Sequence, residues 1–319
     1  MKTKCVVFIF SFNRGRFLEN AVSSLEEKMP DFPLVIIDDH SEDSETKRVL
    51  EGMREKYSVF SPSQDEESSL KHGGLYACMN LAMEIANEWG ATYAVFLQDD
   101  MQMVRTWFDE DWERIVGYFE RNLQSAQLSL TFFKNDDRGQ RKRYSLADGE
   151  SAYFRLPEDW RNIAFSDTGV FDVQRIREVL PRFPPGELTA DRMLRQAGYR
   201  LGFYAYPLIM FLPLPPTWRE KRRSPFFRFA EWLGRVGFYP YESLNHAEVG
   251  RLLDRDLDDL PVGDEWLEAR DLPSCRTVMY EGGFNALRAH GSLRQRFRNP
   301  LRRMDARWAG LERRLRGGR

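Results

Sequence analysis

Two pairs of neighbouring aspartates each follow a short apolar run. Asp38 and Asp39 follow residues 34–37, and Asp99 and Asp100 follow residues 93–97 after the single residue Gln98. One aspartate in such a place is an ordinary turn or helix-capping residue. Two pairs brought together repel each other and raise each other's pKa unless a cation or a donor compensates them. Mg²⁺ and Mn²⁺ take few protein carboxylates and add water and phosphate oxygens, so the pattern predicts a metal site for a phosphorylated ligand.

The elements that must position these carboxylates follow from the spacing of the apolar residues. Continuous runs of strand length, each followed by apolar residues at helical spacing, occupy residues 5–10, 34–37 and 93–97. Strands that alternate with helices and are apolar throughout are typical of a largely parallel sheet buried on both faces. Ligands bind at the carboxyl ends of the strands in such a sheet. Both aspartate pairs and residues 11–14 should therefore face one crevice.

The second half of the chain has a more mixed pattern. Its predicted elements are strands at 128–133 and 199–211, helices at 172–180 and 187–197, and a polar loop at 134–149. The proline-rich residues 213–216 end the core, which divides the chain into a domain of residues 1–216 and a C-terminal extension of residues 217–319. The predicted fold class is α/β, with a mostly parallel sheet flanked by helices and a mainly helical extension.

Short motifs between residues 3 and 212 form an ordered set. Residues 6–14 read VVFIFSFNR, 35–43 read VIIDDHSED, and 96–100 read FLQDD; Gly73 and Gly74 open a helix that carries Asn80. Residues 166–171 read SDTGVF, and 195–200 read RQAGYR. In this order and spacing, the motifs resemble those of the family 2 glycosyltransferases, which have the GT-A type of α/β fold.

The resemblance implies a binding site for a nucleotide sugar. Asp39 would pair with the imide edge of the base, and Phe12 would stack on the base. Asp99 would approach the ribose, and Asp100 would bind the Mn²⁺ or Mg²⁺ ion that bridges the two phosphates. The other donor-site candidates are Ser11, Asn13, Arg14, Lys71, Gly74, Asn80 and Gln98. Gln98 replaces the first residue of the family's DXD-type motif, which leaves Asp100 as the metal-binding carboxylate.

The transfer of a sugar with inversion requires a base that takes the proton of the acceptor hydroxyl. In the family, a pair of acidic residues marks the position of this base. That pair is not intact here, because residues 187–191 read ELTAD. Asp191 is the first candidate and Glu187, four residues earlier on the same helical face, is the second. N-capping or an ordinary surface charge is the structural alternative for either residue.

These residues together predict an inverting, metal-dependent glycosyltransferase. It would move a sugar from a nucleoside diphosphate sugar, with uridine as the favoured nucleoside, to a hydroxyl of a glycan, a lipid-linked or a protein acceptor. A sugar-phosphate nucleotidyltransferase is one alternative, but Ser11 to Gly15 lack the glycine-rich opening expected of that class. The other alternative is a non-catalytic module that binds a nucleotide sugar or a glycan.

The composition predicts a soluble chain in the cytoplasm. The 319 residues are 42% hydrophobic and 30% charged with a net charge of −2, and no apolar stretch is long enough for a membrane span. The last 36 residues, however, hold eleven arginines against Asp305 and Glu312. A basic amphipathic helix with Trp308 would suit peripheral contact with the inner face of a membrane, and docking on an acidic segment or a partner is the alternative. No nucleic-acid-binding motif accompanies the arginines.

Overall fold

The computed structural model describes residues 4–29, 32–63, 74–134, 144–147, 151–155, 165–217 and 224–316. The chain divides into two compact units. The first consists of Met1–Met210 with Ser243–Leu267, and the second of Phe211–Glu242 with Glu268–Arg319. The domain boundary predicted after residue 216 remains a prediction. The residues Ser243–Leu267 return to the first unit although they follow that boundary in the sequence.

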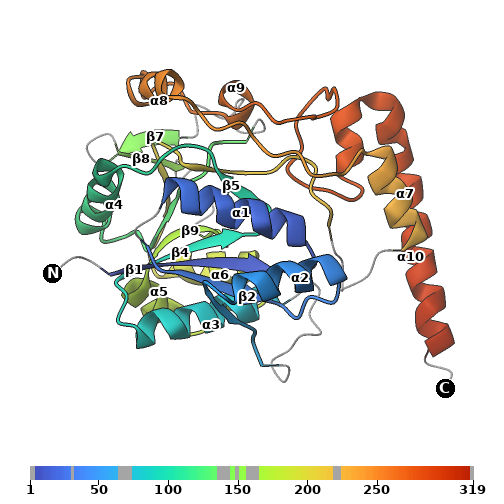
Figure 1. Cartoon of the computed structure of the whole chain (residues 1–319), viewed down its shortest axis with the longest axis horizontal. Helices are drawn as coiled ribbons and strands as arrows, with labels where there is room; N and C mark the ends of the chain where they lie inside the picture. Colours follow the sequence, from blue (N-terminus) through green and yellow to red (C-terminus); the bar gives the residue numbers. More distant parts are fainter. Residues whose placement is uncertain are drawn as a thin grey trace. The chain divides into compact units, whose positions relative to one another are not determined.

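A nine-stranded sheet with the order β3-β2-β1-β4-β9-β6-β10-β8-β7 forms the centre of the first unit (Figure 1). Its first half is parallel, as the apolar runs predict: β1 pairs with β2 on one side and with β4 on the other, and β2 pairs with β3. These strands are β1 (Cys5–Ser11), β2 (Leu34–Asp38), β3 (Ser58–Phe60) and β4 (Tyr93–Gln98). Since Ser11 is in register with Asp38, and Phe10 with Gln98, the three strands end at one edge of the sheet.

Helices cover both faces of this parallel half. Val6, Phe8 and Phe10 of β1 belong to one apolar cluster with residues of α3, and the alternate residues Val7 and Ile9 are also fully buried. Figure 1 shows α1 on the side of the sheet opposite α3. The helices of the first half are α1 (Gly15–Lys28), α2 (Ser44–Met53), α3 (Leu75–Glu88) and α4 (Asp109–Arg121). The predicted α/β fold class, with a large sheet between helices, is thereby confirmed.

The second half of the sheet contains antiparallel pairs, because β9 runs antiparallel between β4 and β6. The predicted strand over 199–211 is in fact two strands, since the turn at Tyr206 and Pro207 interrupts it; the predicted loop over 134–149 contains β7. The remaining elements of this half are β6 (Gln127–Ser129), β7 (Tyr144–Ala147), β8 (Ala152–Arg155), β9 (Gly169–Asp172), α5 (Val173–Val179), α6 (Glu187–Gln196) and β10 (Leu201–Tyr204). The strands β5 (Met101–Met103) and β11 (Ile209–Phe211) pair with each other in a separate two-stranded sheet.

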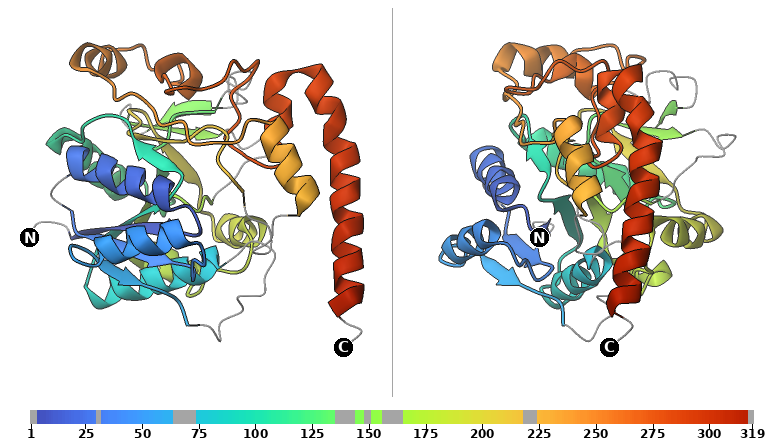
Figure 2. Two further views of the ribbon diagram at one scale, coloured as in Figure 1. Left: turned by 45° about the vertical axis from the view of Figure 1, so that its right-hand side comes forward. Right: turned by 90° about the vertical axis from the view of Figure 1, so that its right-hand side faces the viewer.

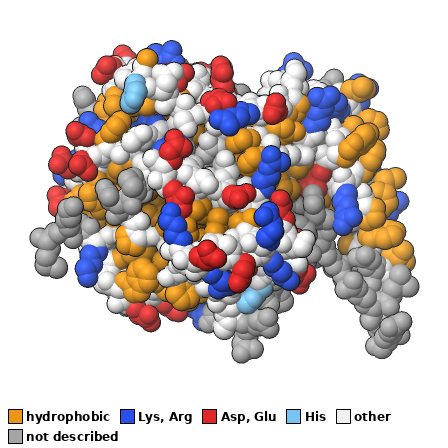
Figure 3. Space-filling model, in the orientation of Figure 1, with side chains coloured by type: hydrophobic (Ala, Val, Ile, Leu, Met, Phe, Trp, Pro, Cys, Tyr) orange, Lys and Arg blue, Asp and Glu red, His pale blue; other side chains and the backbone are white. Residues whose placement is uncertain are grey.

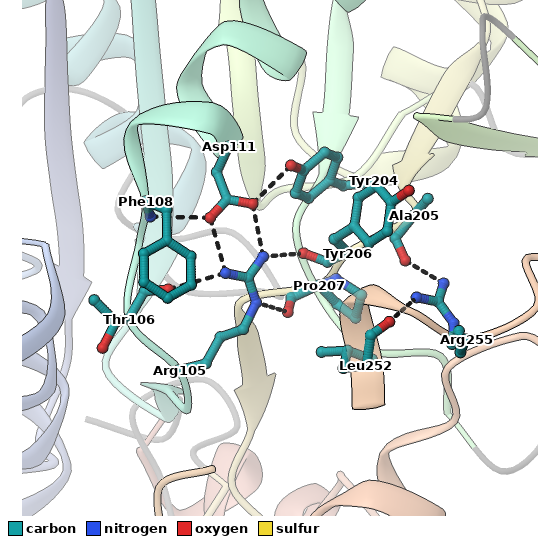
Figure 4. Close-up of polar contacts among 10 residues, drawn as sticks. All are labelled: Arg105, Thr106, Phe108, Asp111, Tyr204, Ala205, Tyr206, Pro207, Leu252 and Arg255. Carbon is teal, nitrogen blue, oxygen red and sulfur yellow. Dashed lines mark hydrogen bonds and ion pairs between the residues drawn. The ribbon is translucent and has the colours of Figure 1, made fainter. Parts of the chain in front are cut away.

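A buried ion pair holds the turn between β10 and β11 (Figure 4). The guanidinium of Arg105, which follows β5, donates to both carboxylate oxygens of Asp111 at 2.8 and 2.7 Å, and both side chains are fully buried. Its other hydrogen bonds include the carbonyls of Tyr206 at 2.7 Å and Pro207 at 3.0 Å, and the Tyr204 hydroxyl donates to Asp111 at 2.7 Å. Buried charges are tolerated when they are paired and hydrogen-bonded in this way. The segment that follows Asp99 and Asp100 is therefore fixed to the sheet.

The segment Ser243–Leu267 contributes the helices α8 (His246–Leu253) and α9 (Gly263–Trp266) to the first unit. Arg255, just after α8, donates to the carbonyls of Leu252 and Ala205 (Figure 4). The contact with Ala205 ties this late segment of the chain to the turn after β10.

The second unit consists mainly of helices. It contains α7 (Pro225–Leu233), a 3₁₀ helix at Ala286–His290 and α10 (Ser292–Arg316). Helices α7 and α10 lie side by side (Figure 2), and Phe227, Phe284 and Leu301 belong to the cluster between them. Ser224 caps α7 and also donates to Asp305 of α10. Among the described residues, none of the helices combines the length and the apolar character needed to cross a bilayer.

Candidate active site

The loops after β1 and β2 are joined by a short hydrogen-bond chain. The Asp38 carboxylate accepts from the backbone N–H and the hydroxyl of Ser41, at 2.7 and 2.6 Å. The Ser41 hydroxyl accepts from the backbone N–H of Asn13 at 2.8 Å, and the Asn13 side chain accepts from the N–H of Glu42 at 2.7 Å. Asn13 and His40 adopt positive φ angles of 52° and 55°, which asparagine tolerates well. Residues 11–14 are thus held beside the aspartates that end β2.

Asp39 lies between the end of β1 and the beginning of α3. Its backbone N–H donates to the carbonyl of Ser11 at 2.9 Å, and its carboxylate accepts from the N–H of Gly74 at 2.7 Å. A Cβ atom at position 74 would lie 2.0 Å from an Asp39 carboxylate oxygen. Only glycine allows this approach, which explains why a glycine precedes the helix.

Arg14 joins both carboxylates that follow β4. Its Nη1 donates to Asp99 at 2.9 Å and to Asp100 at 2.7 Å, and the other Asp99 oxygen accepts from the N–H of Phe12 at 3.0 Å. Burial raises the pKa of Asp99 to about 6 although Arg14 acts in the opposite direction, and the nearby Asp100 raises it further. Although burial lowers the pKa of Arg14, the two carboxylates raise it above its ordinary value. The residues that follow β1 and those that follow β4 therefore form one charged cluster, as the strand pattern predicts.

The oxygen atoms beside Arg14 suit a divalent cation that is held by a single protein carboxylate. The Asp100 Oδ1 atom and the Ser11 hydroxyl are buried and have no hydrogen-bond partner in the structure. Within the described ranges, no three His, Cys, Asp or Glu side chains are grouped closely enough to hold a metal ion. A cation here would therefore bind through Asp100 and complete its shell with phosphate oxygens and water, as Mg²⁺ commonly does.

Asp167 was not among the predicted site residues, although the sequence marks it by the motif SDTGVF. Gln98 donates to its carboxylate at 2.8 Å. Burial raises the pKa of Asp167 to about 7; the charges of Glu187 and Asp100 raise it further, whereas Lys134 lowers it. Gln98 thus links the β4 end to a carboxylate on a segment that precedes β9.

Glu187 and Asp191 have different surroundings on α6. Glu187 is the first residue of the helix. Burial raises the pKa values of Asp167 and Tyr76, and the charge of Glu187 raises both further; a backbone hydrogen bond also joins Glu187 to Tyr76. Asp191 is buried and forms an ion pair at 2.8 Å with Arg195, one turn further along α6. The structure therefore places the second candidate base, Glu187, in the electrostatic neighbourhood of Asp167.

The last two donor-site candidates are Asn80 and Lys71. The side-chain oxygen of Asn80 accepts from the backbone N–H of Phe183 at 2.7 Å, so it holds the segment between α5 and α6. Lys71 lies outside the residues that the structure describes.

Comparison with known proteins identifies the family. The model of glycosyl transferase family 2 matches residues 6–179, which is more than half of the chain. The match spans the three strand ends described above and the Asp167 segment. The chain therefore belongs to glycosyl transferase family 2.

The solved structures to which the chain is similar include S. aureus TarS and a mannosyltransferase. S. aureus TarS matches with a TM-score of 0.45 and 15% identity over 78% of this chain and 42% of the TarS chain. TarS 1–349 in complex with UDP-GlcNAc matches with a TM-score of 0.46 and 15% identity over 78% of this chain and 70% of the other. The mannosyltransferase PcManGT from Pyrobaculum calidifontis, in complex with GDP-Man and Mn²⁺, has a TM-score of 0.40 and 14% identity over 64% of this chain and 57% of its own. The present chain thus spans less than half the length of the longer TarS chain. No curated protein sequence matches it.

Proposed function

We propose that this chain is an inverting, metal-dependent glycosyltransferase that moves a sugar from a nucleoside diphosphate sugar to an acceptor hydroxyl. The observation that carries the proposal is the single guanidinium of Arg14 shared by Asp99 and Asp100, next to strand β2, which Asp39 follows. Carboxylates at the ends of β2 and β4, on either side of β1, suit a ligand with a base at one end and a cation-bound diphosphate at the other.

The proposed donor is a uridine diphosphate sugar. Strands β2 and β4 flank β1, so Asp39 and Asp100 follow strands about 10 Å apart. A carboxylate only accepts hydrogen bonds, so Asp39 suits a base edge that carries an N–H group. Uracil offers such an edge and so does guanine, which makes GDP the comparison nucleotide in any binding assay. Phe12 provides the ring for stacking, and Ser11 and Gly74 contact Asp39. Asn13 fixes the loop after β2 through Ser41 and Glu42.

A divalent cation at Asp100 would neutralise the departing diphosphate, which is Lewis-acid assistance. Arg14 has a complementary role in this proposal. Its guanidinium balances the charge of Asp99 and Asp100, and it can donate to phosphate oxygens because arginine presents several donors in one plane. Asp100 Oδ1, which has no hydrogen-bond partner, remains free to accept the cation while Oδ2 stays with Arg14.

We propose Glu187 as the general base and Asp191 as its alternative. In one in-line displacement, the acceptor hydroxyl oxygen bonds to the anomeric carbon as the bond to the diphosphate oxygen breaks. The hydroxyl proton passes to the carboxylate, and the configuration is inverted. The position of Glu187 near Asp167 favours it, whereas the Asp191 carboxylate already neutralises Arg195.

The test of the function measures donor binding and donor turnover separately. Wild-type protein with Mn²⁺ is expected to bind UDP and to release UDP slowly from UDP-sugars even without an acceptor. Asp100→Ala should lose this release, and chelation of the metal should have the same effect. Tight donor binding without release for any UDP-sugar or GDP-sugar would instead support the non-catalytic module.

A further inference from the structure

Helix α10 of the second unit presents an apolar stripe to solvent. Five of its large apolar side chains are exposed: Leu293, Phe297, Met304, Trp308 and Leu311. At 3.6 residues per turn they fall within about 60° of the helix circumference. The spacing carries the stripe along about 27 Å of the helix axis. Leu293 is 71% exposed and Leu311, at the other end of the stripe, is 51% exposed.

A different face of the same helix attaches it to its own unit. Leu301 is buried in the cluster with Phe227, Asp305 accepts from Ser224, and Arg298 donates to Asn285 at 2.7 Å. These contacts leave the apolar stripe outside. Trp308, at the border of the stripe, packs on α7, where its ring meets that of Phe226 edge-on with the ring centroids 6.2 Å apart.

Arginines line the other border of the stripe. Arg296, Arg303 and Arg307 are exposed and fall within about 40° of one another on the helix circumference, next to the apolar residues. Figure 3 shows hydrophobic and basic side chains along the surface of this helix. Helix α7 of the same unit also exposes Phe229 and Trp232, whose rings stack at 5.5 Å. The exposed surface of α10 thus carries an apolar stripe with a row of arginines beside it.

We propose that this surface binds the face of an anionic phospholipid bilayer, with α10 lying parallel to the membrane plane. An apolar stripe with aromatic side chains enters the boundary between headgroups and acyl chains, and arginines beside it meet the phosphates. A nucleic acid would use the arginines but leave the stripe in water. The inference is independent of the proposed transferase activity, because it concerns another unit of the chain and its assay uses no sugar donor.

The experiment measures how the full chain partitions onto extruded vesicles, by cosedimentation. Vesicles of phosphatidylcholine with phosphatidylglycerol should bind the protein, and vesicles of phosphatidylcholine alone should bind it at least about tenfold more weakly. Binding should fall as salt is added, because salt screens the arginines. The double variant Phe297→Gln/Leu311→Gln should bind anionic vesicles at least about tenfold more weakly than wild type, since it loses two side chains from the apolar stripe.

Matched variants separate the stripe from general effects on the chain. Trp89→Gln/Leu123→Gln removes two exposed apolar residues from the first unit and should bind as wild type does. Should Phe297→Gln/Leu311→Gln unfold at a lower temperature, Leu293→Gln/Met304→Gln provides a second test of the stripe.

Two results would overturn the proposal. One is equal partition of wild type and both stripe variants onto anionic vesicles. The other is a wild-type dimer that becomes a monomer in the stripe variant while neither form binds vesicles, because the stripe would then be an interface between copies of this chain.

Discussion

Nη1 of Arg14 donates hydrogen bonds to both Asp99 and Asp100, at 2.9 and 2.7 Å. Arg14 is the residue before α1, and the two aspartates follow β4, so the bonds connect segments 85 residues or more apart in the chain. The interaction allows two adjacent carboxylates to be buried together, because both pair with the guanidinium of Arg14. It also connects the proposed cation site to the residues that would surround the base.

Removal of Arg14 should destabilise the protein in the absence of metal. Arg14→Ala leaves Asp99 and Asp100 buried without their cation, a change that typically costs about 3–5 kcal/mol. Mn²⁺ should recover more stability for this variant than for wild type, since it supplies the missing positive charge. Thermal unfolding with and without Mn²⁺ measures both effects. Arg48→Ala, an exposed arginine on α2, is the control, and equal unfolding temperatures for Arg14→Ala and wild type would contradict the role of Arg14.

A methyl group at position 74 should weaken nucleotide binding. In Gly74→Ala the new Cβ would lie 2.0 Å from the Asp39 carboxylate, so that carboxylate must move from its present position. Overpacking of this kind costs about 1–3 kcal/mol, and we expect UDP affinity to fall by about tenfold or more. Calorimetric titration with UDP gives the affinity. Gly52→Ala is a matched control because nothing lies within 4 Å of the Cβ it would add; unchanged UDP binding by Gly74→Ala would exclude Asp39 from the base site.

Variants that remove the charge of each candidate base in turn should show which of the two is the base. Glu187→Gln is expected to lower kcat by about 10² to 10⁴ because it removes proton acceptance without changing the size of the side chain. Its affinity for UDP should remain that of wild type. Asp191→Asn should retain most of its kcat and lose stability instead, since it leaves Arg195 without its ion-pair partner. Steady-state kinetics gives the kcat of both variants. A large loss of kcat in Asp191→Asn with little loss in Glu187→Gln would identify Asp191 as the base.

Asp167 should make the stability of the folded protein depend on pH. Burial raises its pKa in the folded protein to about 7, above the ordinary aspartate value of 3.8, so the folded protein retains a proton that the unfolded chain releases. Stability must then fall as pH rises from about 4 to 7 and level off above 7. Asp167→Asn removes this pH dependence and keeps a hydrogen-bond acceptor for Gln98. The stability of the variant relative to wild type should therefore be greater at pH 8 than at pH 5. Unfolding temperatures measured with a chelator check this, and Asp254→Asn, an exposed aspartate, should show no such difference.

The parallel half of the sheet was predictable because its signals are local. The apolar runs of β1, β2 and β4 are long enough to identify, and each ends in polar residues within the next few positions. Their convergence follows from parallel pairing alone. The helix that begins after Gly74 was equally clear, since α3 repeats its apolar residues regularly up to Gly90, which has a φ of 63°.

The position of the segment around Asp167 was less predictable because non-local strand pairing determines it. Strand β9 has four residues and enters the sheet antiparallel between β4 and β6, which no local periodicity indicates. That pairing is what brings the preceding Asp167 to Gln98. Asn80 shows the same limit: its place on a glycine-led helix suggests the donor site, but its side chain reaches Phe183, more than a hundred residues later.

The buried pair of Arg105 and Asp111 restrains the chain beyond β4. Its hydrogen bonds attach the chain just beyond Asp100 to the carbonyls of Tyr206 and Pro207, in a region from which water is excluded. Displacing that segment would expose two unpaired charges to an apolar interior. The chain beyond β4 is therefore held in one position, so that any rearrangement around the proposed donor site is expected in other segments.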